Sequence, residues 1–116
     1  MPHVIIEYSA NICAVDQFSA ITKAAHNVMI RSSLFATSDI KTRSYVAEDF
    51  LVGEKGKEGS FIHVIIYLLE GRSMLQKQAL SESMRDTIKE QVKDIDQLSV
   101  DIRELTKETY RKHVNS

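Results

Sequence analysis

Residues 61–69 form a nearly unbroken apolar run, Phe-Ile-His-Val-Ile-Ile-Tyr-Leu-Leu, and this run constrains the fold more than any other stretch. Loop-forming residues flank it, with Ser60 on one side and Gly71 on the other. A short run that is rich in β-branched residues and bounded in this way is typical of a strand buried on both faces. We interpret His63, which lies inside the run, as a hydrogen-bonded core or interface residue. The sequence therefore predicts a sheet with this strand in its interior.

The tetrapeptide His-Val-Ile-Ile occurs twice, at residues 3–6 and at residues 63–66. Each copy leads into a helical pattern and then into an alternating strand pattern. Two such βαβ units, each with a right-handed crossover, build a four-stranded mixed sheet with both helices on one face. We therefore predict a two-layer α+β fold in one domain over residues 1–116. Its repeat halves are expected at about 2–60 and 61–105, followed by a charged tail over 106–116.

Periodicity places the remaining elements. Strands are predicted over residues 3–8, 40–46 and 98–102, with a strand tail over 50–52 before a glycine-rich hairpin loop. A helix is predicted over residues 14–30, with these residues on its apolar face: Val15, Phe18, Ile21, Ala25, Val28 and Met29. A second helix is predicted to begin after a capping box of Ser73 and Gln76 and to end at about residue 96. Its expected apolar face consists of Leu75, Ala79, Met84, Ile88, Val92 and Ile95.

Composition excludes several classes of protein. The 15 Lys and Arg residues and the 16 Asp and Glu residues are interspersed, which argues against a nucleic-acid-binding protein with a clustered basic face. Cys13 is the only cysteine, so neither a disulfide framework nor a CxxC metal pair is expected, and a packing role is predicted for it. The chain shows neither a signal-peptide pattern nor an apolar run near 18 residues. We therefore expect a cytoplasmic protein without a membrane partner.

Pro2 is the only proline, and it stands directly before the first predicted strand. One interpretation is structural, because proline is tolerated at the first residue of a strand. The other depends on removal of Met1, which would turn the amide nitrogen of Pro2 into a basic secondary amine. An α-amino group titrates at roughly 7.7–8.0, and desolvation or nearby cations lower that pKa towards neutrality. A general base works best near the operating pH, so both interpretations remain open.

The amino-terminal pattern Pro2-His3-x-x-x-Glu7, followed by Ser9-x-Asn11-Ile12, resembles the 5-carboxymethyl-2-hydroxymuconate isomerase branch of the tautomerase superfamily. Two further stretches carry the same resemblance. They are Leu69-Glu70-Gly71-Arg72-Ser73, with Gln76-Lys77 after it, and Ile40-Lys41-Thr42-Arg43. The resemblance extends from Pro2 to about Leu105. It implies the same two-layer fold and an N-terminal proline that acts as general base.

The resemblance assigns substrate-binding roles to Lys41, Arg43 and Arg72. In the family an arginine after the glycine binds a substrate carboxylate, and a guanidinium beside a helix amino terminus suits an anion on physical grounds also. Without the resemblance, Arg72 can equally be interpreted as a solvated surface residue or as the partner of an internal ion pair. Lys41 and Arg43 project from the same face of the predicted strand. Their alternative interpretation is a structural pair of cations on an edge strand. Lys41 replaces a family arginine and lacks its planar fork, which puts bidentate carboxylate binding there in doubt.

The resemblance further implies an isomerase of aromatic catabolism that shuttles a proton in a small unsaturated 2-oxo or 2-hydroxy acid. Neither a metal nor an organic cofactor is expected. The open face of the sheet must be covered, and the family's arrangement implies a homotrimer in which Arg72 serves either its own or a neighbour's Pro2. Two alternatives remain. One is a trimeric binding protein of the same fold without catalysis, and the other is a ferredoxin-like regulatory domain, which predicts a monomer or dimer.

Overall fold

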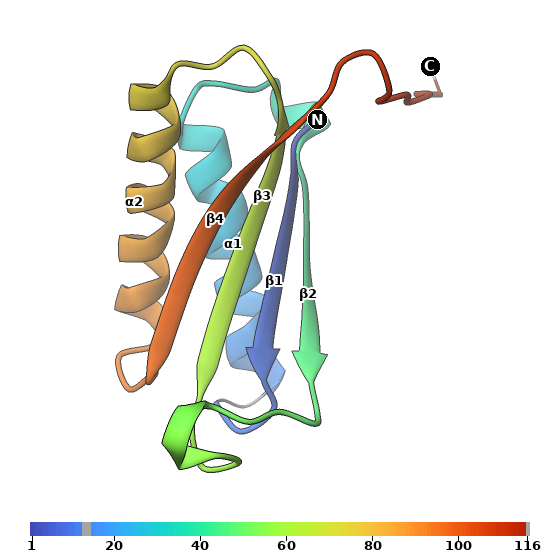
Figure 1. The fold of residues 1–116 in the computed structure, drawn as a ribbon. Coiled ribbons are helices and arrows are strands. Elements are labelled where there is room, and N and C mark those ends of the chain that lie inside the picture. Colours follow the sequence, from blue (N-terminus) through green and yellow to red (C-terminus); the bar gives the residue numbers. More distant parts are fainter. Residues whose placement is uncertain (13–14, 116) are drawn as a thin grey trace.

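The computed structural model describes residues 1–12 and 15–115, in which two helices cover one face of a sheet (Figure 1). The elements in chain order are β1 (His3–Ser9), α1 (Val15–Arg31), β2 (Lys41–Ala47), β3 (Phe61–Leu69), α2 (Met74–Gln91) and β4 (Gln97–Leu105). Short 3₁₀ turns occupy Thr37–Asp39 and Gly53–Lys55. Across the described residues, the helices are too short or too polar to cross a membrane.

The strand order is β2-β1-β3-β4, which confirms the two predicted βαβ units. β1 pairs parallel with β2, β3 pairs parallel with β4, and β1 and β3 pair antiparallel. The starts of β1 and β2 therefore lie at the same end of the sheet as the ends of β3 and β4. In the register, His3 stands beside Lys41 on one side and Tyr67 on the other. We call this end of the sheet the Pro2 edge.

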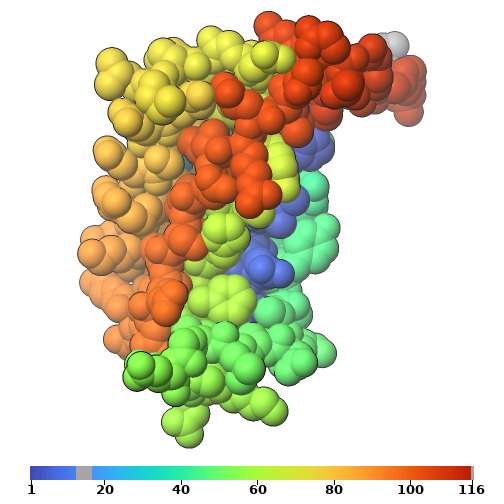
Figure 2. All heavy atoms as spheres, in the orientation of Figure 1, coloured from blue at the N-terminus to red at the C-terminus, as the bar shows by residue number. Residues whose placement is uncertain are grey.

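The core lies between the sheet and the two helices. Alternate residues of β3 point into it and are fully buried: Ile62, Val64, Ile66 and Leu68. The helices contribute Phe18, Ile21, Ala25, Val28 and Met29 from α1 and Leu80, Met84 and Ile88 from α2. Among the described residues, no helix covers the other face of the sheet, and Figure 2 shows side chains of all four strands lying along it. On this open face the β3 side chains are only partly buried.

The predicted apolar face of α2 was partly wrong. Leu75 is 78% exposed and Ala79 is also exposed, whereas Leu80, Met84 and Ile88 form the buried line. At 3.6 residues per turn, Ala79 and Leu75 lie about 100° and 140° around the helix axis from Leu80, so they point away from the core.

Other boundaries also differ from the expectation. α2 ends at Gln91, so Val92 and Ile95 pack against the core from the turn after it. Val52 makes an isolated bridge to Gly56 where a strand tail was expected. Cys13, Ala14 and the side chain of Val15 lie outside the described part of the chain, so the packing role predicted for Cys13 stays a prediction.

The amino terminus of α2 carries the predicted capping box. The hydroxyl of Ser73 accepts from the backbone N–H of Gln76 at 3.1 Å, and the Gln76 side chain accepts from the backbone N–H of Ser73 at 2.9 Å. We expect Ser73→Ala to lower the free energy of unfolding by about 1 kcal/mol, because the backbone N–H of Gln76 loses its acceptor. Urea unfolding measures this, and Ser83→Ala, in the exposed interior of α2, is the control. Equal stability of the two variants would contradict the capping role.

Candidate active site

A cavity of about 290 Å³ opens at the Pro2 edge. Four parts of the chain enclose it: the amino terminus, the turn before β2, the connection from β3 to α2, and the C-terminal tail. Its lining residues are Met1, Asp39, Leu69, Arg72, Tyr110 and Lys112. Asp39 is the only acidic residue among them, and two of the six are cationic. The cavity therefore suits a small anion that also presents apolar surface.

Met1, which is bonded to the nitrogen of Pro2, lines this cavity. The Met1 residue is only 7% exposed, and Pro2 is fully buried behind it. The carbonyl of Pro2 accepts a hydrogen bond from the backbone N–H of Lys41 at 3.1 Å, which fixes Pro2 against the start of β2. Burial, followed by the nearby ammonium groups of Lys41 and Lys112, lowers the pKa of the Met1 amino group to about 6. The Pro2 edge thus favours a neutral amine.

Arg72 reaches the same cavity from the turn between β3 and α2. Gly71 has φ +126° at this turn, a conformation that side-chain-bearing residues rarely adopt, and it redirects the chain out of β3. Nη2 of Arg72 donates to the carbonyl of Leu34 at 2.7 Å, and its Cζ lies 4.7 Å from the centre of the Phe35 ring. The carbonyl and the ring hold the guanidinium at the cavity wall and leave other N–H groups for an anion.

Lys41 and Arg43 project from the same face of β2, as the alternation predicted, but they have different partners. The ammonium of Lys41 donates to the carbonyl of Asp39, close enough to the amino terminus to act on its pKa. Nη1 of Arg43 contacts Nδ1 of His3 at 3.2 Å. Neither residue lines the cavity itself. Lys41 lies beside the amino terminus, and Arg43 is linked through His3 to the lining residue Tyr110.

The C-terminal tail supplies two residues that the sequence analysis did not assign to the site. The Tyr110 hydroxyl lies 3.2 Å from Nε2 of His3, and Nζ of Lys112 lies 2.9 Å from a carboxylate oxygen of Asp39. The Lys112 hydrogen bond holds the pKa of Asp39 below its usual range, so Asp39 is a carboxylate at neutral pH. The alternation of apolar and polar residues that marks β4 ends at Leu105, so no local pattern points to Tyr110 or Lys112. The one signal for them is topological: a last strand that runs parallel to β3 must end near Pro2, so the tail after it starts there.

Two further polar residues, Glu7 and His63, are not among the residues that line the cavity. Glu7 and His63 stand opposite each other on β1 and β3, on the open face of the sheet. Nδ1 of His63 lies 2.6 Å from the hydroxyl of Ser99, which agrees with its interpretation as a hydrogen-bonded residue.

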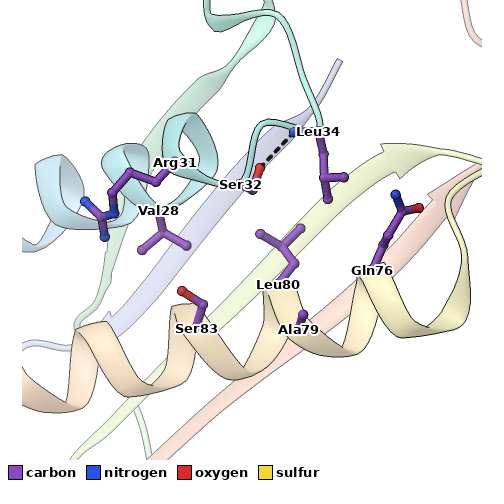
Figure 3. Close-up of a pocket in the computed structure, with 8 residues that line it drawn as sticks. All are labelled: Val28, Arg31, Ser32, Leu34, Gln76, Ala79, Leu80 and Ser83. Carbon is purple, nitrogen blue, oxygen red and sulfur yellow. Dashed lines mark hydrogen bonds between the residues drawn. The ribbon is translucent and has the colours of Figure 1, made fainter.

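A second cavity, also of about 290 Å³, lies on the helical side of the protein between α1 and α2 (Figure 3). Val28, Leu34, Ala79 and Leu80 give it an apolar wall, and Arg31 is its only charged residue. Neither Met1, which precedes Pro2, nor Arg72 is among its lining residues. The cavity at the Pro2 edge is therefore the better candidate for an active site.

Comparisons with known proteins agree with this architecture. The model of the family described as 5-carboxymethyl-2-hydroxymuconate isomerase matches residues 2–116. A solved 5-carboxymethyl-2-hydroxymuconate isomerase from Deinococcus radiodurans R1 superposes with a TM-score of 0.87 at 19% identity, covering 98% of this chain and 90% of that one. A solved 5-carboxymethyl-2-hydroxymuconate delta-isomerase gives a TM-score of 0.79 at 16% identity, covering 99% and 89%.

A fused 4-OT symmetric trimer gives a TM-score of 0.75 at 18% identity, covering 90% of this chain and 86% of that one. No curated protein sequence matches this chain. At these identities the solved structures establish the fold, which is that of the tautomerases, while the family model covers nearly the whole chain. The protein belongs to the 5-carboxymethyl-2-hydroxymuconate isomerase family, and this membership supports an isomerase or tautomerase function.

Proposed function

We propose that this protein moves a proton within a small unsaturated 2-oxo or 2-hydroxy acid, with the nitrogen of Pro2 as general base once Met1 is removed. The observation that carries the proposal is the position of Met1. It lines the cationic cavity and is bonded to the Pro2 nitrogen, so its removal would enlarge the cavity and leave a basic nitrogen at this place. The lowered pKa of the Met1 amine supports a neutral amine at this position near pH 7.

The chemistry needs two proton transfers and no cofactor. Pro2 takes a proton from a carbon next to the carbonyl or from the enol hydroxyl, and the electron pair moves into the conjugated system. The resulting prolinium returns the proton to a different carbon. In this proposal Arg72 binds the substrate carboxylate, because its guanidinium lines the cavity. Lys41 and Arg43 stabilise the negative oxygen and favour neutral Pro2.

A second candidate is a binding protein of the same fold that does not catalyse a reaction. The burial of Met1 favours it, because a retained Met1 keeps the Pro2 nitrogen as an amide and packs into the protein at this place. The presence of Lys41 where the family has an arginine favours it also. Intact mass spectrometry of the protein from cells separates the two candidates, since only the enzyme requires the loss of Met1.

We propose further that the protein is a homotrimer. The open face carries a partly buried apolar band with Ile5, Phe61, Ile65 and Leu69 among its residues, and neither helix covers it. Another copy of the sheet would remove this band from water, which is worth about 25 cal/mol per Å² of apolar surface. The fused 4-OT protein, which has the same fold, is a symmetric trimer, and this supports the assembly.

The function is tested with protein that begins at Pro2 and an enol acid such as phenylenolpyruvate. We expect ketonisation at a kcat/KM that rises with pH, because only the neutral amine accepts a proton. The apparent pKa should lie below the ordinary α-amino range, since burial and Lys41 disfavour the charged amine. Lys41→Met removes one of those charges and should therefore move the rising limb of the profile to higher pH.

Lys93→Met is the matched control, because Lys93 is exposed beyond the far end of α2. Its profile should coincide with that of the parent protein. A rising limb that stays in place in Lys41→Met would show that Lys41 does not set the basicity of Pro2. A complete lack of turnover with every enol acid tried would reject the proposed function.

A further inference from the structure

Residues 106–112 follow β4, and we call this segment the C-terminal strap. It runs along the Pro2 edge and passes the ends of β3, β1 and β2 in turn (Figure 1). Its three anchors follow the strand order. The N–H of Lys107 donates to the Glu70 carboxylate beyond β3 at 3.0 Å, Tyr110 contacts His3 on β1, and Lys112 pairs with Asp39 before β2. Backbone hydrogen bonds from Thr109 and Tyr110 to the carbonyl of Thr106, both at 3.1 Å, shape the turn between them. The strap therefore places Tyr110 at the cavity by defined contacts.

The hydrogen bonds around His3 fix its protonation pattern. A guanidinium can only donate, so the 3.2 Å contact with Arg43 requires Nδ1 of His3 to be the acceptor. The proton of neutral His3 then lies on Nε2, which donates to the Tyr110 hydroxyl at 3.2 Å. Burial, followed by the charges of Arg43 and Lys41, lowers the pKa of His3, which favours this neutral form.

This pattern leaves the hydroxyl hydrogen of Tyr110 free for an acceptor in the cavity. Tyr110 lines the cavity beside Arg72, and in the part of the chain that the structure describes its hydroxyl has His3 as its side-chain partner. A hydroxyl that accepts one hydrogen bond becomes a better donor of the next. The contacts from Arg43 through His3 thus leave Tyr110 with a polarised O–H group at the cavity that it lines.

We propose that Tyr110 is a catalytic residue of this site, which donates a hydrogen bond to the substrate oxygen that becomes negative when Pro2 removes a proton, and that His3 positions it. The proposal rests on the proposed function and adds a group from outside the stretches that carry the family resemblance. The transferred proton passes from carbon or from the enol hydroxyl to the Pro2 nitrogen, and then to a carbon. Tyr110 keeps its own proton and stabilises the enolate oxygen until the prolinium returns the proton to carbon.

The direct test is Tyr110→Phe in protein that begins at Pro2. This change keeps the ring, which packs edge-on against His3 with centroids 6.3 Å apart, and removes only the hydroxyl. We expect kcat to fall about 10²–10³-fold, as when one donor to an oxyanion is removed, with little change in KM. Tyr45→Phe is the matched control, because Tyr45 is 53% exposed and lies towards the other end of β2, and its kcat should not change.

A pair of His3 variants separates positioning from simple packing. Gln places an amide N–H near the position of Nε2, so His3→Gln retains a donor to Tyr110, whereas the shorter side chain of His3→Asn does not reach it. We expect kcat to be largely kept in His3→Gln and lost in His3→Asn. In the unaltered protein, ¹⁵N chemical shifts of the His3 ring should show the proton on Nε2.

The outcomes distinguish this inference from the proposed function. If the parent protein is active and Tyr110→Phe has the same kcat, or if the proton of His3 lies on Nδ1, the role of Tyr110 is rejected and Pro2 catalysis stands. If the parent protein turns over no enol acid, the proposed function fails and the role of Tyr110 fails with it. A loss in Tyr110→Phe with retention in His3→Gln supports both.

Discussion

Protein that begins at Pro2 is expected to ketonise an enol acid about 10²–10⁴ times faster than protein that retains Met1, the usual contribution of a general base. The physical reason is the chemistry of one nitrogen. In the chain with Met1 this nitrogen is an amide, which has no basicity, and the buried Met1 residue takes up part of the space beside Pro2 at the cavity wall. Removal of Met1 converts the nitrogen into an amine and enlarges the cavity in the same step.

The comparison uses two preparations of one sequence, one cleaved from a fusion to begin at Pro2 and the other cleaved to begin at Met1. Intact mass confirms each terminus, and loss of enol absorbance gives the rate. Pro2→Ala, prepared with Ala at the terminus, should lose most of the rate as well, because the buried ring that holds the amine in place is gone. Equal rates for the two termini would reject Pro2 as the base.

Most of the fold could be predicted because the repeated tetrapeptide and the helix and strand patterns after each copy agree with the tertiary structure. The repeated His-Val-Ile-Ile stretch becomes β1 and β3, the two central strands, and the helix and strand after each copy complete the two units. The failure at α2 has a physical cause. Leu75 and Ala79 look apolar in sequence, but the buried line is set by Leu80, Met84 and Ile88, which meet the core at intervals of four.

The candidate site was only partly predictable. Pro2, Lys41 and Arg72 follow from local motifs at strand ends, and the strand order brings these ends together. Tyr110 and Lys112 could not be identified in this way, because the tail has no periodic pattern. Their positions depend on long-range contacts with His3 and Asp39, residues 107 and 73 positions away in the chain. Such contacts follow from the completed fold, not from a local signal.

Ile65→Lys is expected to convert the proposed trimer into folded monomers. Ile65 lies in the central strand β3 on the open face, partly buried and opposite Ile5 on one side and Asp101 on the other. In a single subunit the new ammonium can extend into water beside Asp101, so the subunit should remain folded. A trimer that covers this face would have to bury the charge, at a cost of about 3–5 kcal/mol if it lacks a partner. That cost weakens association about 10²–10⁴-fold.

Light scattering measures the result directly. The parent protein should give three times the monomer mass of 13.2 kDa, Ile65→Lys should give the monomer mass, and circular dichroism should show that its helices and strands persist. Leu75→Lys introduces the same charge on the outer surface of α2, where Leu75 is 78% exposed, and should leave the trimer intact. A parent protein that stays at the monomer mass at micromolar concentration would contradict the trimer. If Ile65→Lys remains trimeric, a different face joins the subunits, because an ammonium at the centre of this sheet face is incompatible with close packing against it.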